Sequence, residues 1–248
     1  KDANRKTNAM TDAATSIHAE REIPDFAARY PNLANARLGA EVVSVTDEFF
    51  AERSRLIKAE EAVFYPDLYD DHGKWMDGWE SRRRRSGGND HALIKLGGPT
   101  VVRAINIDTA FFTGNYPHAA RVMGAYHEGE GLPADAAYRT LVDMSKLGPD
   151  APHWFEVSHA EPVTHLRLDM YPDGGIARLR VHGIPVSEPT TNENAVNELS
   201  SILNGGRVLA FNDSHYGNPE ILLYPDKGLN MGDGWETRRR REPGFDWI

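Results

Sequence analysis

The sequence predicts an all-β protein, built as an antiparallel β-sandwich or jelly roll. Many short segments are rich in Val and Ile, several of them alternate apolar with polar residues, and Gly and Pro separate them. Helical patterns are few and short, which favours a sandwich over a helical or mixed fold. The expected strands are residues 41–45, 91–96, 101–107, 153–158, 163–171 and 176–183.

The segment VTHLRLDMY (163–171) shows the alternation most clearly. It places Leu166, Leu168 and Met170 on the face toward the core, because successive side chains of a strand point to opposite faces. The opposite face carries His165, Arg167 and Asp169, and we expect these three to face solvent.

The segments between the strands predict turns and two short helices. Gly97-Gly98-Pro99 is expected to separate strand 91–96 from strand 101–107. Residues 46–56, with Thr46 or Asp47 as the cap, and residues 193–203 are the expected helices.

Composition narrows the class of protein. Apolar residues make up 40% and charged residues 26% of 248 residues, as in soluble globular proteins. No apolar run is long enough to span a membrane, and the net charge of −9 argues against nucleic acid as a partner. The absence of cysteine excludes disulfides and a Cys nucleophile and fits a reducing, cytoplasmic location.

The chain contains an internal repeat. GKWMDGWESRRRR (73–85) returns as LNMGDGWETRRRR (229–241), and LANARLGAEVVSVTD (33–47) aligns with LSSILNGGRVLAFND (199–213). Two copies in the same order predict a duplicated domain. We expect a flexible tail at 1–22, a first domain at 23–186, a linker at 187–194 and the N-terminal part of a second, truncated domain at 195–248.

Three motifs resemble the allantoicase family: DLYDDHGKWMDGWESRRRR, NIDTAFFTGNYP and MGDGWETRRRREPGFDWI. The resemblance covers the chain from about residue 24 to its end. It implies tandem jelly-roll domains similar to galactose-binding and discoidin folds. It also implies hydrolysis of allantoate, a small-molecule substrate, to ureidoglycolate and urea in purine (allantoin) degradation, by a homo-oligomer.

The arginine runs are candidates for binding the substrate carboxylate. In an extended segment Arg82 and Arg84 point one way and Arg83 and Arg85 the other, so that one pair can enter a site. A guanidinium fork matches a carboxylate with two hydrogen bonds. In the second copy, Arg238 corresponds to Arg82 and is a further candidate for substrate binding. The alternative is a solvated charged strand or a network of salt bridges.

Candidates for acid and base roles are Glu80, Asp77 and His91. Glu80 and its counterpart Glu236 lie just before the arginines, where Glu236 is a candidate for substrate binding. Each of these residues has a structural alternative. The glutamates could pair with arginines, Asp77 could form a turn, and His91 could be a surface or packed histidine.

The motif DTAFFTGNYP adds Asp108, Thr109 and Asn115 as polar residues that could line a substrate pocket. Gly114-Asn115 could equally form a tight turn. No compact His or carboxylate pattern marks a metal site, and a divalent metal held by scattered Asp, Glu and His residues is left open.

Two other functions fit the same residues. One is a discoidin-like module that binds a ligand without catalysis. The other is hydrolysis of a related ureido acid such as ureidoglycolate, which the arginines would serve equally well.

Overall fold

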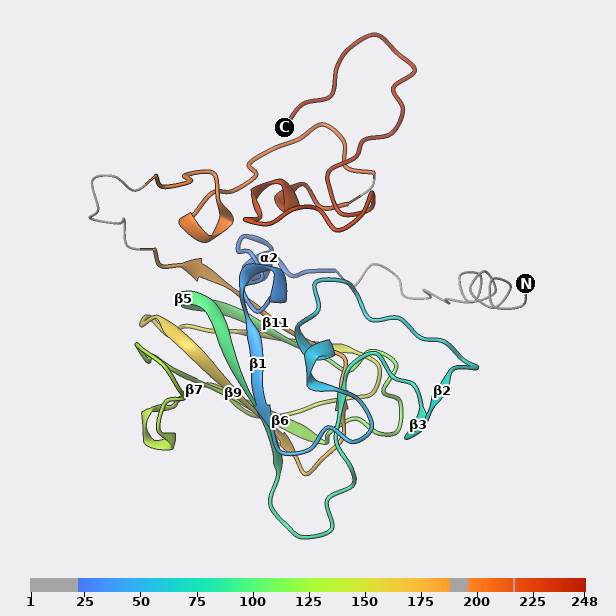
Figure 1. The fold of residues 1–248 in the computed structure, drawn as a ribbon, viewed down its shortest axis with the longest axis vertical. Coiled ribbons are helices and arrows are strands. Elements are labelled where there is room, and N and C mark those ends of the chain that lie inside the picture. The colour runs from blue at the N-terminus through green and yellow to red at the C-terminus, as the bar shows by residue number, and fades with distance from the viewer. Residues whose placement is uncertain (1–21, 188–195, 216) are drawn as a thin grey trace.

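The computed structural model describes residues 22–187, 196–215 and 217–248 (Figure 1). All but one residue of the predicted tail, and most of the predicted linker, lie outside these ranges. Below, residues 22–187 are called the N-terminal unit and residues 196–248 the C-terminal unit.

The regular secondary structure of the N-terminal unit is almost entirely β, as the sequence predicts. Its strands are β1 (Glu41–Val45), β2 (Tyr69–Asp70), β3 (Gly73–Lys74), β4 (Trp79–Glu80), β5 (Asp90–Asp108), β6 (Ala119–Ala125), β7 (Arg139–Lys146), β8 (Pro152–Glu156), β9 (Val163–Tyr171), β10 (Gly175–Ile176) and β11 (Arg178–Pro185). Its helical elements are short: α2 (Asp25–Ala28) and 3-10 turns at Ala36–Leu38, Arg53–Ile57 and Asp135–Ala137. The C-terminal unit has 3-10 turns at Ile202–Asn204 and Pro219–Leu223.

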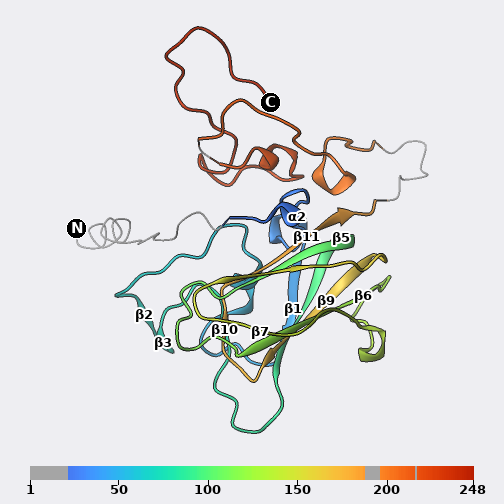
Figure 2. The same cartoon turned by 180° about the vertical axis from the view of Figure 1, so that it is seen from behind.

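The long strand β5 connects the two layers of a sandwich. Its first half pairs with β1 and β9, and β6 and β7 extend that layer beyond β9. Its second half pairs with β11 and β8. All of these pairings are antiparallel, and Figures 1 and 2 show β5 curving between the layers.

The expectation of two separate strands at 91–96 and 101–107 is therefore corrected. Gly97-Gly98-Pro99 bends the strand without ending it, and the register with β9 shifts between Lys95 and Thr100. A Cβ on Gly97 would lie 1.7 Å from the Leu38 carbonyl oxygen, so the bend needs glycine there. A strand that changes layers by a local irregularity is a known way to form a sandwich corner.

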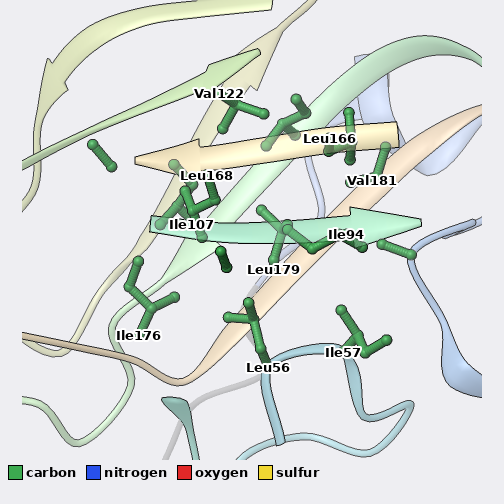
Figure 3. Packing of buried hydrophobic residues seen from close by; sticks show 14 of the residues in the cluster. Leu56, Ile57, Ile94, Ile107, Val122, Leu166, Leu168, Ile176, Leu179 and Val181 are labelled. Carbon is green, nitrogen blue, oxygen red and sulfur yellow. The ribbon is translucent and has the colours of Figure 1, made fainter. Parts of the chain in front are cut away.

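The core lies between the two layers (Figure 3). Ile94, Leu166 and Leu168 enter from one layer, and Ile107, Leu179 and Val181 from the other, all fully buried. Figure 3 shows Leu56 and Ile57 closing this core from one side.

The outer face of β9 differs from the expectation. Leu166, Leu168 and Met170 are buried as predicted, but His165 and Asp169 are buried as well. Arg121 and Arg167 both donate hydrogen bonds to the Asp169 carboxylate, and the ring of His127 lies 5.8 Å from that of His165. Neighbouring long side chains thus cover a face that alternation alone assigns to solvent.

The two expected α-helices are also wrong. Residues 46–56 hold only the 3-10 turn Arg53–Ile57, because Thr46 and Asp47 bond to Asp90 and Arg82 instead of capping a helix. Residues 193–195 lie outside the described residues, and the rest of segment 193–203 reaches only the 3-10 turn Ile202–Asn204.

The C-terminal unit lies against the end of the sandwich that carries α2 (Figures 1 and 2). Ile202, Leu203, Leu223 and Tyr224 pack on Leu33 and Leu38 of the N-terminal unit. Arg37 forms ion pairs with Asp226 and Asp233. In its described residues the C-terminal unit has two 3-10 turns and no named strand.

Candidate active site

Both copies of the tryptophan motif use the same hydrogen bonds. The indole N–H of Trp79 donates to the Asp47 carbonyl at 2.8 Å, and that of Trp235 donates to the Asp213 carbonyl at 2.8 Å. Trp79 is fully buried and belongs to the core. The repeat read from the sequence is therefore also a repeat of local structure.

The first and third arginines of each run are held by acids. Arg82 binds Asp47 through its backbone N–H and its guanidinium, and Arg84 forms an ion pair with Asp90 at 2.6 Å. In the second copy Arg238 pairs with Asp213 and Arg240 with Asp246. These four arginines have carboxylate partners within the fold.

The second and fourth arginines of the first run are different. Arg83 and Arg85 are exposed and form no hydrogen bond or ion pair with any described residue. The alternation of an extended segment thus separates a paired set from an unpaired set. Arg83 and Arg85 are thus two exposed cations available for an external anion.

Glu80 is a buried carboxylic acid without a cation partner. It lies on β4, between Ala51 and β10, and only 8% of the residue is exposed. Among the described residues, its side chain accepts one hydrogen bond, from the Asn115 amide at 2.7 Å. Burial raises the pKa of Glu80 to about 7, against the lowering effect of that hydrogen bond. Near neutral pH the acid can both hold and release a proton.

Asp77 has the opposite environment. Arg178 binds one carboxylate oxygen at 2.7 Å, and the Val63 N–H donates to the same oxygen, while Lys58 binds the other oxygen at 3.0 Å. Burial alone would raise the pKa of Asp77, but the two cations hold it below its ordinary value. These contacts indicate a structural carboxylate that joins the turn to β11.

His91 lies on the outer face of β5, opposite Asp169 of β9. Its burial and the nearby Arg167 lower its pKa. Its side chain forms no hydrogen bond with Glu80 or Asp77. The structure therefore does not join the three acid and base candidates into one hydrogen-bonded group.

The pocket-loop candidates have separate positions. Asn115 meets Glu80, as described, whereas the Thr109 hydroxyl donates to the Gly148 carbonyl at 2.7 Å and accepts from the Ala151 N–H. Asp108 accepts a hydrogen bond from the Ala110 N–H and lines a cavity. Glu236 is exposed and, unlike Glu80, forms no hydrogen bond with a described residue.

That cavity, between the N-terminal and C-terminal units, was not predicted. It has a volume of about 980 Å³. Asn106, Asp108, Trp154, Arg180 and His182 line it from the N-terminal unit, and Tyr224 and Asp233 line it from the C-terminal unit. The sequence feature that could have indicated it is the alternation of polar residues in RLRVH (178–182), which puts Arg180 and His182 on one face.

Within the described ranges, no three His, Cys, Asp or Glu side chains gather in a way that could hold a metal ion. None of the helices in these ranges is long and apolar enough to cross a membrane.

The fold defines a β-sandwich protein with a repeated motif, and the motif of the first copy combines a buried acid with exposed arginines, which suits a hydrolase of a small anion. The family model described as "Allantoicase repeat" matches residues 31–186 and 197–248. The chain belongs to the allantoicase family.

Individual relatives agree. A probable allantoicase of Ralstonia nicotianae is 52% identical over 90% of this chain and 67% of its own length. One of Acinetobacter baylyi is 46% identical over 94% of this chain and 70% of its own length. The crystal structure of allantoicase from Saccharomyces cerevisiae superposes with a TM-score of 0.75 at 35% identity, over 87% of this chain and 65% of that one. The chain thus spans about two thirds of the length of these proteins.

Proposed function

We propose that the protein hydrolyses allantoate to ureidoglycolate and urea. Membership of the allantoicase family supports this reaction and favours an enzyme over a discoidin-like binding module. The observation that supports a mechanism at this site is Glu80, a buried acid with a pKa of about 7.

In the proposed reaction the bond between the central carbon of allantoate and one ureido nitrogen breaks. Glu80 donates its proton to that nitrogen, so that urea leaves as a neutral molecule. The oxygen of water then bonds to the central carbon and loses one proton, which restores the acid. Allantoate plus water thus gives ureidoglycolate plus urea, without any other reactant.

Arg83 and Arg85 are the proposed anchors for the substrate carboxylate, because they are the arginines of the first run without a partner in the fold. Arg82 and Arg84 hold the segment in place through Asp47 and Asp90, as Arg238 does through Asp213 in the second copy. Asn115 orients the acid. Asp77 and Thr109 support the surrounding turns, and the structure offers His91 no contact with this group.

Urea release from allantoate by the full-length protein tests the proposal. We expect Glu80→Gln to lower kcat by roughly 10²–10⁴-fold and the wild-type kcat to fall as pH rises above about 7. The double variant Arg83→Ala/Arg85→Ala should raise KM. Arg53→Ala is the control, since Arg53 pairs with the exposed Glu48. Wild-type kinetics in both site variants would show that this site does not carry the reaction, and a chelator arm tests for a metal.

We also propose that residues 23–186 and 195–248 belong to consecutive domains of a cytoplasmic homo-oligomer without a nucleic-acid partner. The absence of cysteine and the net charge of −9 support the location and the lack of nucleic acid. Light scattering on the full-length protein measures the oligomeric state.

A further inference from the structure

The cavity between the two units rests on one face of the second layer of the sandwich. In the register of β11, β5 and β8, Arg180 lies opposite Asn106 and Asn106 opposite Trp154. His182 lies two residues beyond Arg180 on β11, and Asp108 two residues beyond Asn106 on β5, so both share this face. The other face of the same strands carries Ile105, Ile107, Leu179 and Val181 into the core.

The polar groups of this face are unusually buried. Asn106, Asp108, Arg180 and His182 are each less than 9% exposed, yet all four line the cavity. Buried polar side chains in folded proteins normally have hydrogen-bond partners. Groups of this face that lack one can therefore indicate a ligand.

Three polar groups of this face lack a partner among the described residues, and of these atoms only the Trp154 indole nitrogen is itself fully buried. The Nδ1 of His182 lies 2.8 Å from the Tyr30 carbonyl and must carry the proton, which leaves Nε2 as an acceptor without a partner in the described structure. The Asn106 Oδ1 accepts from the His153 N–H, while its amide N–H₂ donates to no described residue. The Trp154 indole N–H is buried and has no hydrogen-bond partner in the described part of the chain.

The charged side chains that line the cavity indicate whether its ligand is neutral or charged. Arg180 already donates to the Lys58 and Glu60 carbonyls and to the Glu61 carboxylate. Arg37 and Arg207 are paired with Asp226 and Glu220. The cationic side chains of the cavity are thus in use, which favours a neutral ligand over an anion.

We propose that this cavity is a binding site for a neutral ureido group, separate from the site at Glu80. The carbonyl oxygen of the ureido group accepts from the N–H donors of Asn106 and Trp154, and an N–H of the group donates to the His182 Nε2. A second N–H faces the Asp108 carboxylate. The site follows from the cavity alone, whereas its use for the substrate or the released urea rests on the proposed function.

Ligand-observed NMR on the full-length protein tests the site, with N-carbamoylglycinamide as a neutral ureido probe. N-acetylglycinamide is the matched control, since a methyl group replaces the terminal NH₂ of the ureido group and the rest of the molecule is unchanged. We expect saturation transfer to the first probe and weaker transfer to the second. The anionic N-carbamoylglycine distinguishes the two sites, because the cavity favours a neutral ligand whereas the arginines of the first run favour an anion.

Trp154→Phe keeps the ring and removes the N–H, and His182→Asn keeps a donor for the Tyr30 carbonyl and removes Nε2. Each variant should weaken binding of N-carbamoylglycinamide about fivefold to tenfold, as expected for one lost hydrogen bond. Arg83→Ala/Arg85→Ala should leave this binding unchanged. Unchanged binding in both cavity variants, or no binding by the folded wild type, would overturn the proposal. Because no turnover is measured, these outcomes are independent of whether allantoate is hydrolysed.

Discussion

Glu80 allows a test of its protonation state that does not depend on activity. Its pKa rises from 4.5 to about 7 on folding, so the folded protein binds the proton more tightly than the unfolded chain. The free energy of unfolding must then fall as pH rises from about 4.5 to about 7, by about 3 kcal/mol in total. Glu80→Gln removes this loss. We expect the variant to exceed the wild type in stability at pH 8, by up to that amount, and to match it near pH 4.5, in urea denaturation.

Asp77→Asn is the opposite control for that experiment. The pKa of Asp77 is lowered on folding, so its contribution is present at neutral pH and is lost as pH falls below about 4. The variant should be less stable than the wild type at pH 8, since it leaves the Arg178 charge without its buried partner. If both variants shift stability in the same direction at pH 8, the raised pKa of Glu80 is wrong.

At the scale of residues, the sequence indicated the right motif but could not divide its members by role. Arg82 to Arg85 read as four equal candidates, and only the positions of Asp47 and Asp90 separate the paired from the free ones. Asp47 is 35 residues from Arg82, a separation that no local pattern reveals. Glu80 and Asp77 looked alike for the same reason, because their partners are distant in the sequence: Asn115 lies in the loop before β6, and Arg178 lies on β11.

At the scale of elements, the bend in β5 offers a direct test. Gly97→Ala places a Cβ against the Leu38 carbonyl, a backbone atom that cannot move aside, whereas a Cβ on the neighbouring Gly98 meets nothing within 4 Å. We expect Gly97→Ala to lower the free energy of unfolding by at least about 1–3 kcal/mol. Gly98→Ala should stay within about 0.5 kcal/mol of the wild type. Equal stabilities of the two variants in chemical denaturation would contradict the close approach at Gly97.

The strands with clear alternation were predictable. Residues 41–45 and 163–171 match β1 and β9 at both ends. Alternation indicates β9, whereas the valines of EVVSV indicate β1, which has a register shift between Val42 and Ser44. β6 and β7 were missed, and register shifts interrupt their pairing, so that the pattern of alternate residues breaks. The expected helix at 46–56 failed because its polar residues bond to distant strands, which local propensity does not include.

At the scale of the whole molecule, Arg37 connects the two units. Its guanidinium donates to Asp226 at 2.6 Å, pairs with Asp233, and lies 4.9 Å from the centre of the Tyr224 ring. The hydrogen bond to Asp226 is the main reason that the pKa of Arg37 is raised. Arg37 itself therefore stays charged at every pH at which the protein is folded, and the connection weakens only when the carboxylates take up protons.

Arg37→Met should loosen the C-terminal unit without unfolding the sandwich. The methionine keeps the apolar stem against Tyr224 but removes the charged hydrogen bonds, each worth about 1.5–3 kcal/mol. Hydrogen exchange should then become roughly 10- to 100-fold faster in residues 219–233, while β5 and β9 keep their protection. Arg53→Met loses the ion pair with Glu48 and one hydrogen bond to the Val42 carbonyl, both within the N-terminal unit, so it is the control and should not change exchange in residues 219–233. Equal acceleration in β9 would mean that Arg37 stabilises the entire fold, and no acceleration in residues 219–233 would mean that the apolar contacts of Leu33, Leu38 and Ile202 hold the units together without it.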